Sequence, residues 1–128
     1  MSLKRVLVVE DNERNRKVVR IVLNAQGYEV LEATNADEAL EILRADTPDL
    51  ILMDIGLPGM SGDELTRQIK AAPEWAHLPI IALTAHAMKG EREQFLDAGC
   101  DDYISKPIDT HVLVDLVQNY LPKDKKNG

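Results

Sequence analysis

Five side chains with carboxylate, hydroxyl or amine chemistry each follow a short run that is typical of a strand: Glu10, Asp11, Asp54, Thr84 and Lys106. In a parallel sheet the carboxyl ends of the strands share one edge, so these groups are expected to converge there. Three carboxylates held close together repel one another, and a cation relieves that repulsion. Oxygen ligands favour a hard ion, and Mg²⁺ is typically held by one or two carboxylates together with water and phosphate.

Asp54 is the candidate nucleophile of this group. A carboxylate can attack phosphorus and form an aspartyl-phosphate. Mg²⁺ and the ammonium group of Lys106 would neutralise the oxygens of the transferring phosphoryl group, and the Thr84 hydroxyl could then donate a hydrogen bond to one of them. Each residue alone has an ordinary explanation, as a loop acid, a strand-end hydroxyl or a solvated lysine. Their coincidence at four strand ends of one sheet favours the functional explanation for the set.

The segments that position these groups alternate between strand and helix patterns five times. The apolar run 50–53 leads into Asp54, and the chain then breaks at Gly56 and Pro58, which is typical of a strand buried on both faces. The alternation predicts an α/β fold with a parallel sheet and right-handed crossovers. The expected strands are residues 5–9, 28–33, 50–54, 79–84 and 101–105. Because the second and fifth carry charges, we expect them at the edges, which gives the doubly wound order 2-1-3-4-5.

The helices between these strands are expected to have one apolar stripe each. The stripe predicted for the first helix is Val18, Ile21, Val22 and Ala25. Asn35 followed by Glu38, and the same spacing after Ser61, indicates capping boxes at the next two helix starts. The helix expected over residues 88–98 has a thin stripe, chiefly Phe95 and Leu96, and should therefore be one of the least stable elements.

Composition sets limits on the function. The 128 residues are 45% hydrophobic and 29% charged, which fits one compact domain over 1–128, with a core at about 4–121 and a polar tail at 122–128. A net charge of -7 disfavours DNA as a partner. No apolar run approaches the roughly 20 residues of a membrane span, so no membrane insertion is expected. A lone Cys100 and the lack of an N-terminal apolar segment fit a cytoplasmic protein.

The sequence resembles the receiver domains of bacterial two-component response regulators, the CheY-like family, from about Lys4 to about Leu121. Four groups carry the resemblance: Glu10-Asp11, Asp54 with Pro58 and Gly62, Thr84-Ala85, and Lys106-Pro107. The segments 87–90 and 98–107 are most like single-domain regulators of the DivK type. Receivers within hybrid histidine kinases are similar there, so a receiver cut from a hybrid kinase or a larger regulator is an alternative.

The resemblance implies a role for each acid and for the lysine. Asp54 would be the phosphoacceptor. Asp11, Asp54 and the backbone carbonyl of Gly56 would be the direct Mg²⁺ ligands, and Glu10 would complete the acidic pocket. Lys106 would contact the phosphoryl group.

The resemblance also implies a switch and a lifetime. Thr84 and Tyr103 would be the switch pair, and the bond from Lys106 to Pro107 would be cis. Gly56 and His86 occupy the variable positions that flank the pocket and tune the lifetime of the phosphoryl group. Because Gly56 has no side chain to orient an attacking water, slow self-hydrolysis is expected.

The implied function is a phosphorylation-controlled signalling switch and not a turnover enzyme. A sensor histidine kinase or a histidine phosphotransfer protein would supply the phosphoryl group. A downstream protein would bind the modified form, with the chain a monomer or a weak phosphorylation-dependent dimer. A phosphohydrolase of the haloacid dehalogenase type is a weaker alternative, because it would have a second Asp where this chain has Gly56. A flavodoxin-like flavin carrier is also weaker, since the acids at 10–13 would repel its phosphate.

Overall fold

Strands and helices alternate along the part of the chain that the computed structural model describes, residues 3–85 and 89–122, with the backbone alone for 89–92. The strands are β1 (Arg5–Val9), β2 (Glu29–Ala33), β3 (Leu50–Asp54), β4 (Ile80–Thr84) and β5 (Asp102–Ser105). The helices are α1 (Glu13–Ala25), α2 (Ala36–Ala45), α3 (Gly62–Ala71), α4 (Lys89–Ala98) and α5 (Thr110–Tyr120). Each strand begins at the residue predicted from the sequence or one residue after it.

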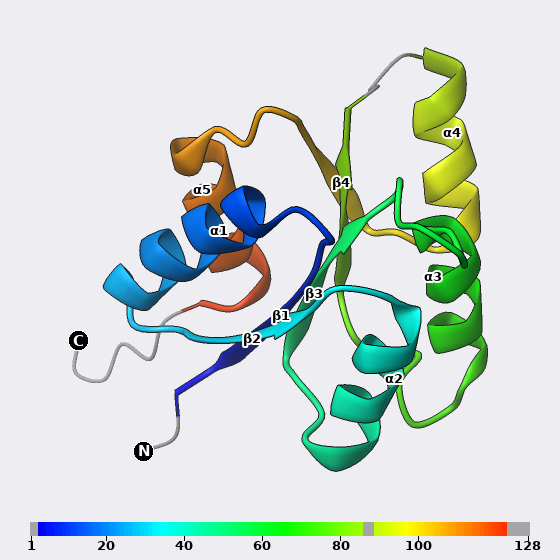
Figure 1. Ribbon diagram of the computed structural model, residues 1–128, viewed down its shortest axis with the longest axis horizontal. Coiled ribbons are helices and arrows are strands. Elements are labelled where there is room, and N and C mark those ends of the chain that lie inside the picture. Colours follow the sequence, from blue (N-terminus) through cyan, green and yellow to red (C-terminus); the bar gives the residue numbers. More distant parts are fainter. Residues whose placement is uncertain (1–2, 86–88, 123–128) are drawn as a thin grey trace.

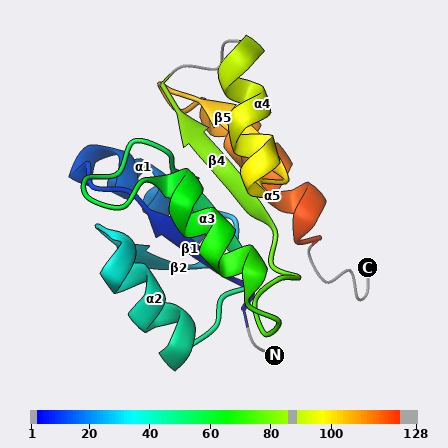
Figure 2. The same cartoon turned by 90° about the vertical axis from the view of Figure 1, so that its right-hand side faces the viewer.

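The five strands form one parallel sheet in the order β2-β1-β3-β4-β5, which confirms the predicted order. Helices α1 and α5 cover one face, and α2, α3 and α4 cover the other (Figures 1 and 2). The pairing of Val9 with Met53 aligns the ends of β1 and β3. Glu10 follows Val9 and Asp54 follows Met53, so the register alone makes these two carboxylates neighbours.

Alternation along the central strands divides the core into two layers. Val6 and Val8 point toward α1 and α5, whereas Leu7 and Val9 point toward α2 and α3. All four side chains are fully buried. The central strands therefore present apolar side chains to both layers and leave polar chemistry to the strand ends.

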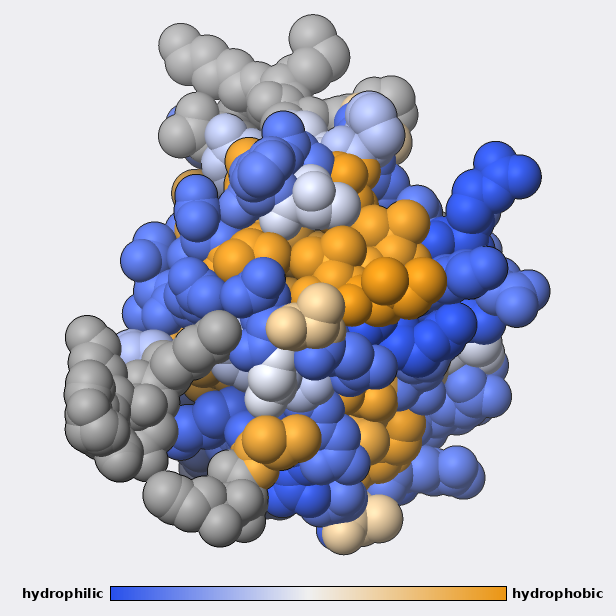
Figure 3. All heavy atoms as spheres, turned by 90° about the vertical axis from the view of Figure 1, so that its left-hand side faces the viewer, coloured by the Kyte–Doolittle hydropathy of each residue, from blue (hydrophilic) through white to orange (hydrophobic). Residues whose placement is uncertain are grey.

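The apolar stripe of α1 differs from the prediction. Val19 and Leu23 are fully buried, whereas Ile21 is 56% exposed and Ala25 is also exposed. The segment has apolar residues at both 18–19 and 21–23, so two neighbouring stripes fit it equally well. Packing of Val19 and Leu23 against α5 selects one of them. On this side of the molecule, apolar side chains gather over α1 and α5 (Figure 3), and Ile21 is the most exposed large one of these two helices.

The helix starts show which polar predictions hold. Ser61 and Glu64 form the predicted capping box of α3. Asn35 caps α2 by accepting from the Glu38 N–H at 2.9 Å. The predicted capping box is wrong there, because the Glu38 carboxylate accepts from both the N–H and the hydroxyl of Thr34 instead.

The apolar stripe of α4 is narrower than predicted. Phe95 is 2% exposed, but its neighbour Leu96 is 43% exposed. Adjacent helical positions diverge by about 100°, so a helix lying on a sheet cannot bury both fully. None of the helices in the described ranges is long and apolar enough to cross a membrane.

Candidate functional site

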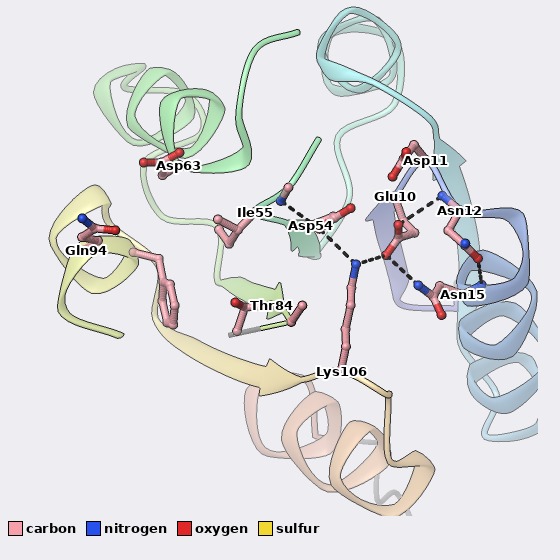
Figure 4. A pocket seen from close by; sticks show the side chains of 13 residues that line it. Glu10, Asp11, Asn12, Asn15, Asp54, Ile55, Asp63, Thr84, Gln94 and Lys106 are labelled. Atoms are coloured by element: carbon pink, nitrogen blue, oxygen red, sulfur yellow. Dashed lines mark hydrogen bonds and ion pairs between the residues drawn. The ribbon is translucent and has the colours of Figure 1, made fainter. Parts of the chain in front are cut away.

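The strand ends enclose a cavity of about 470 Å³ (Figure 4). The cavity is lined by all five side chains that were predicted from the sequence to converge there: Glu10, Asp11, Asp54, Thr84 and Lys106. They come from the ends of β1, β3 and β4 and from the residue after β5. The parallel topology brings them together across almost one hundred residues of chain.

Lys106 reaches between two buried carboxylates (Figure 4). Its Nζ lies 3.0 Å from Oε1 of Glu10 and 3.1 Å from Oδ1 of Asp54. Burial disfavours the charge on Lys106, but the hydrogen bonds to both carboxylates outweigh it and raise the lysine pKa. Burial also disfavours the charged form of Glu10, which for a carboxyl group raises the pKa. The hydrogen bond from Lys106 offsets part of that rise. The lysine is therefore a positive charge held against the nucleophile candidate.

The β1–α1 connection orients Glu10. The Glu10 carboxylate accepts from the backbone N–H of Asn12 at 3.1 Å and from the side-chain amide of Asn15 at 3.3 Å. Asn12 also caps α1, since its side chain accepts from the N–H of Asn15 at 3.0 Å. The same asparagines thus begin the helix and fix the acid. Asn15 was missed from the sequence, although the spacing of a cap residue and its partner was a usable signal.

The β3–α3 connection orients Asp54. Its Oδ1 accepts from the N–H of Gly56 at 2.9 Å, and the following Ile55 N–H donates to the Leu83 carbonyl of β4 at 3.0 Å. A Cβ at Gly62 would lie 2.2 Å from the Asp54 carbonyl oxygen. Glycine at 62 therefore lets α3 approach the end of β3 closely.

Three carboxylates in the cavity fit a hard cation. Ligand oxygens of Glu10, Asp11 and Asp54 all lie within 4.8 Å of one another. Glu10 and Asp54 are buried, whereas Asp11 is exposed at the mouth. An all-oxygen set with an open side suits Mg²⁺, which retains waters and accepts phosphate oxygens. Gly56, whose carbonyl was the third predicted ligand, lines the same cavity.

The predicted switch residues lie on neighbouring strands. Thr84 is 6% exposed at the end of β4, and its carbonyl accepts from the Lys106 N–H at 2.7 Å. Tyr103, on β5, pairs with Ala82 of β4. It is not among the residues that line the cavity. Its ring lies 5.7 Å from that of Phe95, which does line it. Phe95 therefore both lines the cavity and packs on the tyrosine, a relation that no sequence pattern indicated.

Two predicted positions remain, Pro107 and His86. The Lys106–Pro107 peptide bond is cis. His86 lies outside the described residues. Asp63 and Gln94 line the side of the cavity away from Glu10 and Asp11, and neither was predicted (Figure 4).

Comparison with known proteins agrees with this arrangement. The model of the response regulator receiver domain family matches residues 6–118. The polar-differentiation response regulator DivK of Brucella anthropi is 48% identical over 118 residues, which cover 92% of this chain and 96% of that protein.

Solved structures share the fold. The receiver domain of the sensor histidine kinase PA1611 from Pseudomonas aeruginosa, with a magnesium ion coordinated in its active site cleft, is 36% identical with a TM-score of 0.86. The match covers 95% of this chain and all of that one. The chemotaxis response regulator CheY4 of Vibrio cholerae is 26% identical with a TM-score of 0.88, over 93% of this chain and 99% of that one.

Proposed function

This chain belongs to the receiver-domain family of two-component response regulators, and from that premise we propose that Asp54 is its phosphoacceptor. The reaction would take a phosphoryl group from the phosphohistidine of a sensor histidine kinase or a histidine phosphotransfer protein. The contact of Lys106 with both Glu10 and Asp54 carries this proposal, because it holds a cation where phosphoryl oxygens would arrive.

The proposed transfer step uses these contacts. A carboxylate oxygen of Asp54 attacks the phosphorus and forms a P–O bond as the P–N bond to the donor histidine breaks. The imidazole leaves as the neutral base after keeping or taking up one proton. Lys106 then exchanges one of its carboxylate contacts for a phosphoryl oxygen, and the Thr84 hydroxyl donates to another. Asp11, Asp54 and the Gly56 carbonyl would hold Mg²⁺, which supplies further neutralisation of those oxygens when bound.

The output is a change in protein binding and not turnover of a substrate. Thr84 would move toward the phosphoryl group, and Tyr103 would follow together with Phe95, against which its ring packs. A downstream protein would then bind the altered α4–β5 region. Gly56 carries no side chain that could orient a hydrolytic water, so reset would depend on a partner phosphatase or on reverse transfer. We further propose that the chain acts in the cytoplasm as a monomer or a weak phosphorylation-dependent dimer.

The test is labelling by acetyl phosphate with Mg²⁺, followed by mass analysis. The native chain is expected to gain one acid-stable, base-labile phosphoryl group, and Asp54→Asn none. Asp63→Asn is the matched control, because Asp63 lines the same cavity but lies outside the carboxylate cluster. Equal labelling of the native chain and of Asp54→Asn would overturn the assignment, and loss of labelling in Asp63→Asn would show that the cavity as a whole is required.

A further inference from the structure

Arg16 on α1 holds the backbone that carries two of the three clustered acids. Its Nη1 donates to the carbonyl oxygen of Glu10 at 3.0 Å and to that of Asp11 at 3.2 Å. One guanidinium nitrogen therefore contacts two consecutive carbonyls of the loop that carries Glu10 and Asp11. Two contacts from one nitrogen fix the relative tilt of the two peptide groups, which one contact would leave free.

Glu32 on the edge strand β2 holds Arg16 in place. Its Oε1 accepts from Nε of Arg16 at 3.1 Å, and its Oε2 accepts from Nη1 of Arg20 at 2.7 Å. The Arg16 side chain is only 15% exposed, against 39% for Arg20. The two arginines share one partner, but in the described part of the chain only Arg16 also reaches the loop carbonyls.

Asp11 depends on this support more than the other two acids do. Glu10 accepts from Asn12, Asn15 and Lys106, and Asp54 accepts from Gly56 and Lys106. Among the described side chains, residues 3–85 and 93–122, no group donates a hydrogen bond to the exposed Asp11 carboxylate. Among the described groups, the backbone of residues 10–11 is therefore what places the Asp11 carboxylate near the other two acids.

We infer that Arg16 is a positioning residue for the cation site: it fixes the Glu10–Asp11 backbone so that the Asp11 carboxylate faces Asp54. The inference rests on the proposed function, since it deepens its Mg²⁺-dependent step. The inference also predicts a change in Mg²⁺ affinity opposite to the one that electrostatics alone would give. Removing a positive charge near a cation site should strengthen cation binding through electrostatics alone, whereas loss of positioning should weaken it.

The experiment measures the affinity of the full chain for Mg²⁺ alone by following the backbone amide signals of residues 10–12 and 53–56. Groups that orient metal ligands typically contribute about 10- to 100-fold in affinity. We expect Arg16→Gln to weaken Mg²⁺ binding about tenfold. Arg16→Lys keeps the charge but cannot span Glu32 and both carbonyls, so we expect about threefold weaker binding.

Arg20→Gln is the matched control, because it removes a cation from the same Glu32 without touching the loop. Its affinity for Mg²⁺ should stay within about twofold of native. Thermal unfolding without Mg²⁺ is measured for each variant, so that a loss of stability is separated from a loss of affinity. If Arg16→Gln does not keep a native-like amide spectrum, Arg16→Lys carries the test.

Each outcome decides the matter. Equal or tighter Mg²⁺ binding by Arg16→Gln overturns the inference, and so does equal weakening by Arg16→Gln and Arg20→Gln. A variant that loses thermal stability but keeps its affinity shows a role in folding only, which also overturns it. A native chain that does not bind Mg²⁺ at all would instead overturn the metal step of the proposed function.

Discussion

The two sides of the cavity are built in different ways. On the side of α1, polar contacts join helix, loop and strand: Asn15 and Lys106 hold Glu10, and Arg16 holds the loop carbonyls. On the side of α4, Phe95 and Ala98 are the buried residues among the described side chains 93–98. Hydrogen bonds are directional, whereas apolar packing tolerates sliding. The comparison indicates that directional contacts hold the side carrying the acids, whereas apolar packing holds the α4 side, where we propose the switch.

The largest expected effect concerns the β3–α3 connection, which carries Asp54. Gly62→Ala would place a Cβ 2.2 Å from the Asp54 carbonyl oxygen and 2.8 Å from the Ile55 Cα, and neither backbone atom can yield. We expect the free energy of unfolding to fall by more than about 4 kcal/mol, as measured by urea denaturation. Gly56→Ala is the control, since its Cβ would lie 3.7 Å from the Asp54 Oδ1, an ordinary contact. Similar unfolding free energies for the two variants would show that the β3–α3 connection is not fixed.

A smaller effect is expected on the α4 side of the cavity. Phe95→Ala removes the largest buried side chain described in α4 and should cost about 3 kcal/mol. Hydrogen exchange in the native state should show the loss mainly in α4 and β5, because Phe95 packs on Tyr103. Leu96→Ala, at a 43% exposed position, should change exchange little. A loss of protection spread evenly over α1 would contradict the contrast between the two sides.

The smallest effect concerns the thiol that follows α4. Burial of Cys100 raises its pKa from 9.0 to about 11, with its Sγ 3.8 Å from the Thr66 Oγ1. The folded state thus favours the neutral thiol. That preference adds stability below pH 9 and is lost as the pH rises through about 11. At pH 8 the thiolate fraction is about 100-fold lower than for an ordinary thiol.

We therefore expect a thiol reagent to react at pH 8 at least about 100-fold more slowly with the native chain than with the chain unfolded in urea. Phe95→Ala should raise the native rate, because opening of α4 would expose the thiol. A native rate close to the unfolded one would mean that the α4 side is open most of the time. A rate that Phe95→Ala leaves unchanged would mean that Cys100 does not report on α4.

Strand order and the five cavity residues that directly follow or end strands could be predicted because they depend on short local patterns. The run of apolar residues before Asp54 identifies a central strand whatever surrounds it. The charges of Glu29 and Glu32 identify an edge in the same way. Once the strand order is known, parallel topology alone brings Glu10, Asp54 and Lys106 to one edge.

What could not be predicted depends on distances across the chain. The buried stripe of α1 contains Val19 and not Ile21 because α5, almost one hundred residues later, packs on that side. The contacts of Arg16 with loop carbonyls involve no side-chain pattern that a sequence could display. Glu32 looked like a residue that merely interrupts an edge strand, yet it is the shared partner of two arginines.

The two-layered core has a consequence for how information leaves the molecule. Leu52 packs in the layer under α1 and α5, Met53 packs in the layer under α2 and α3, and Asp54 follows both. A displacement of this one backbone segment is therefore transmitted into two interiors that the sheet keeps apart. The proposed phosphorylation of Asp54 would therefore act at the one point of β3 from which both layers of the core can be reached.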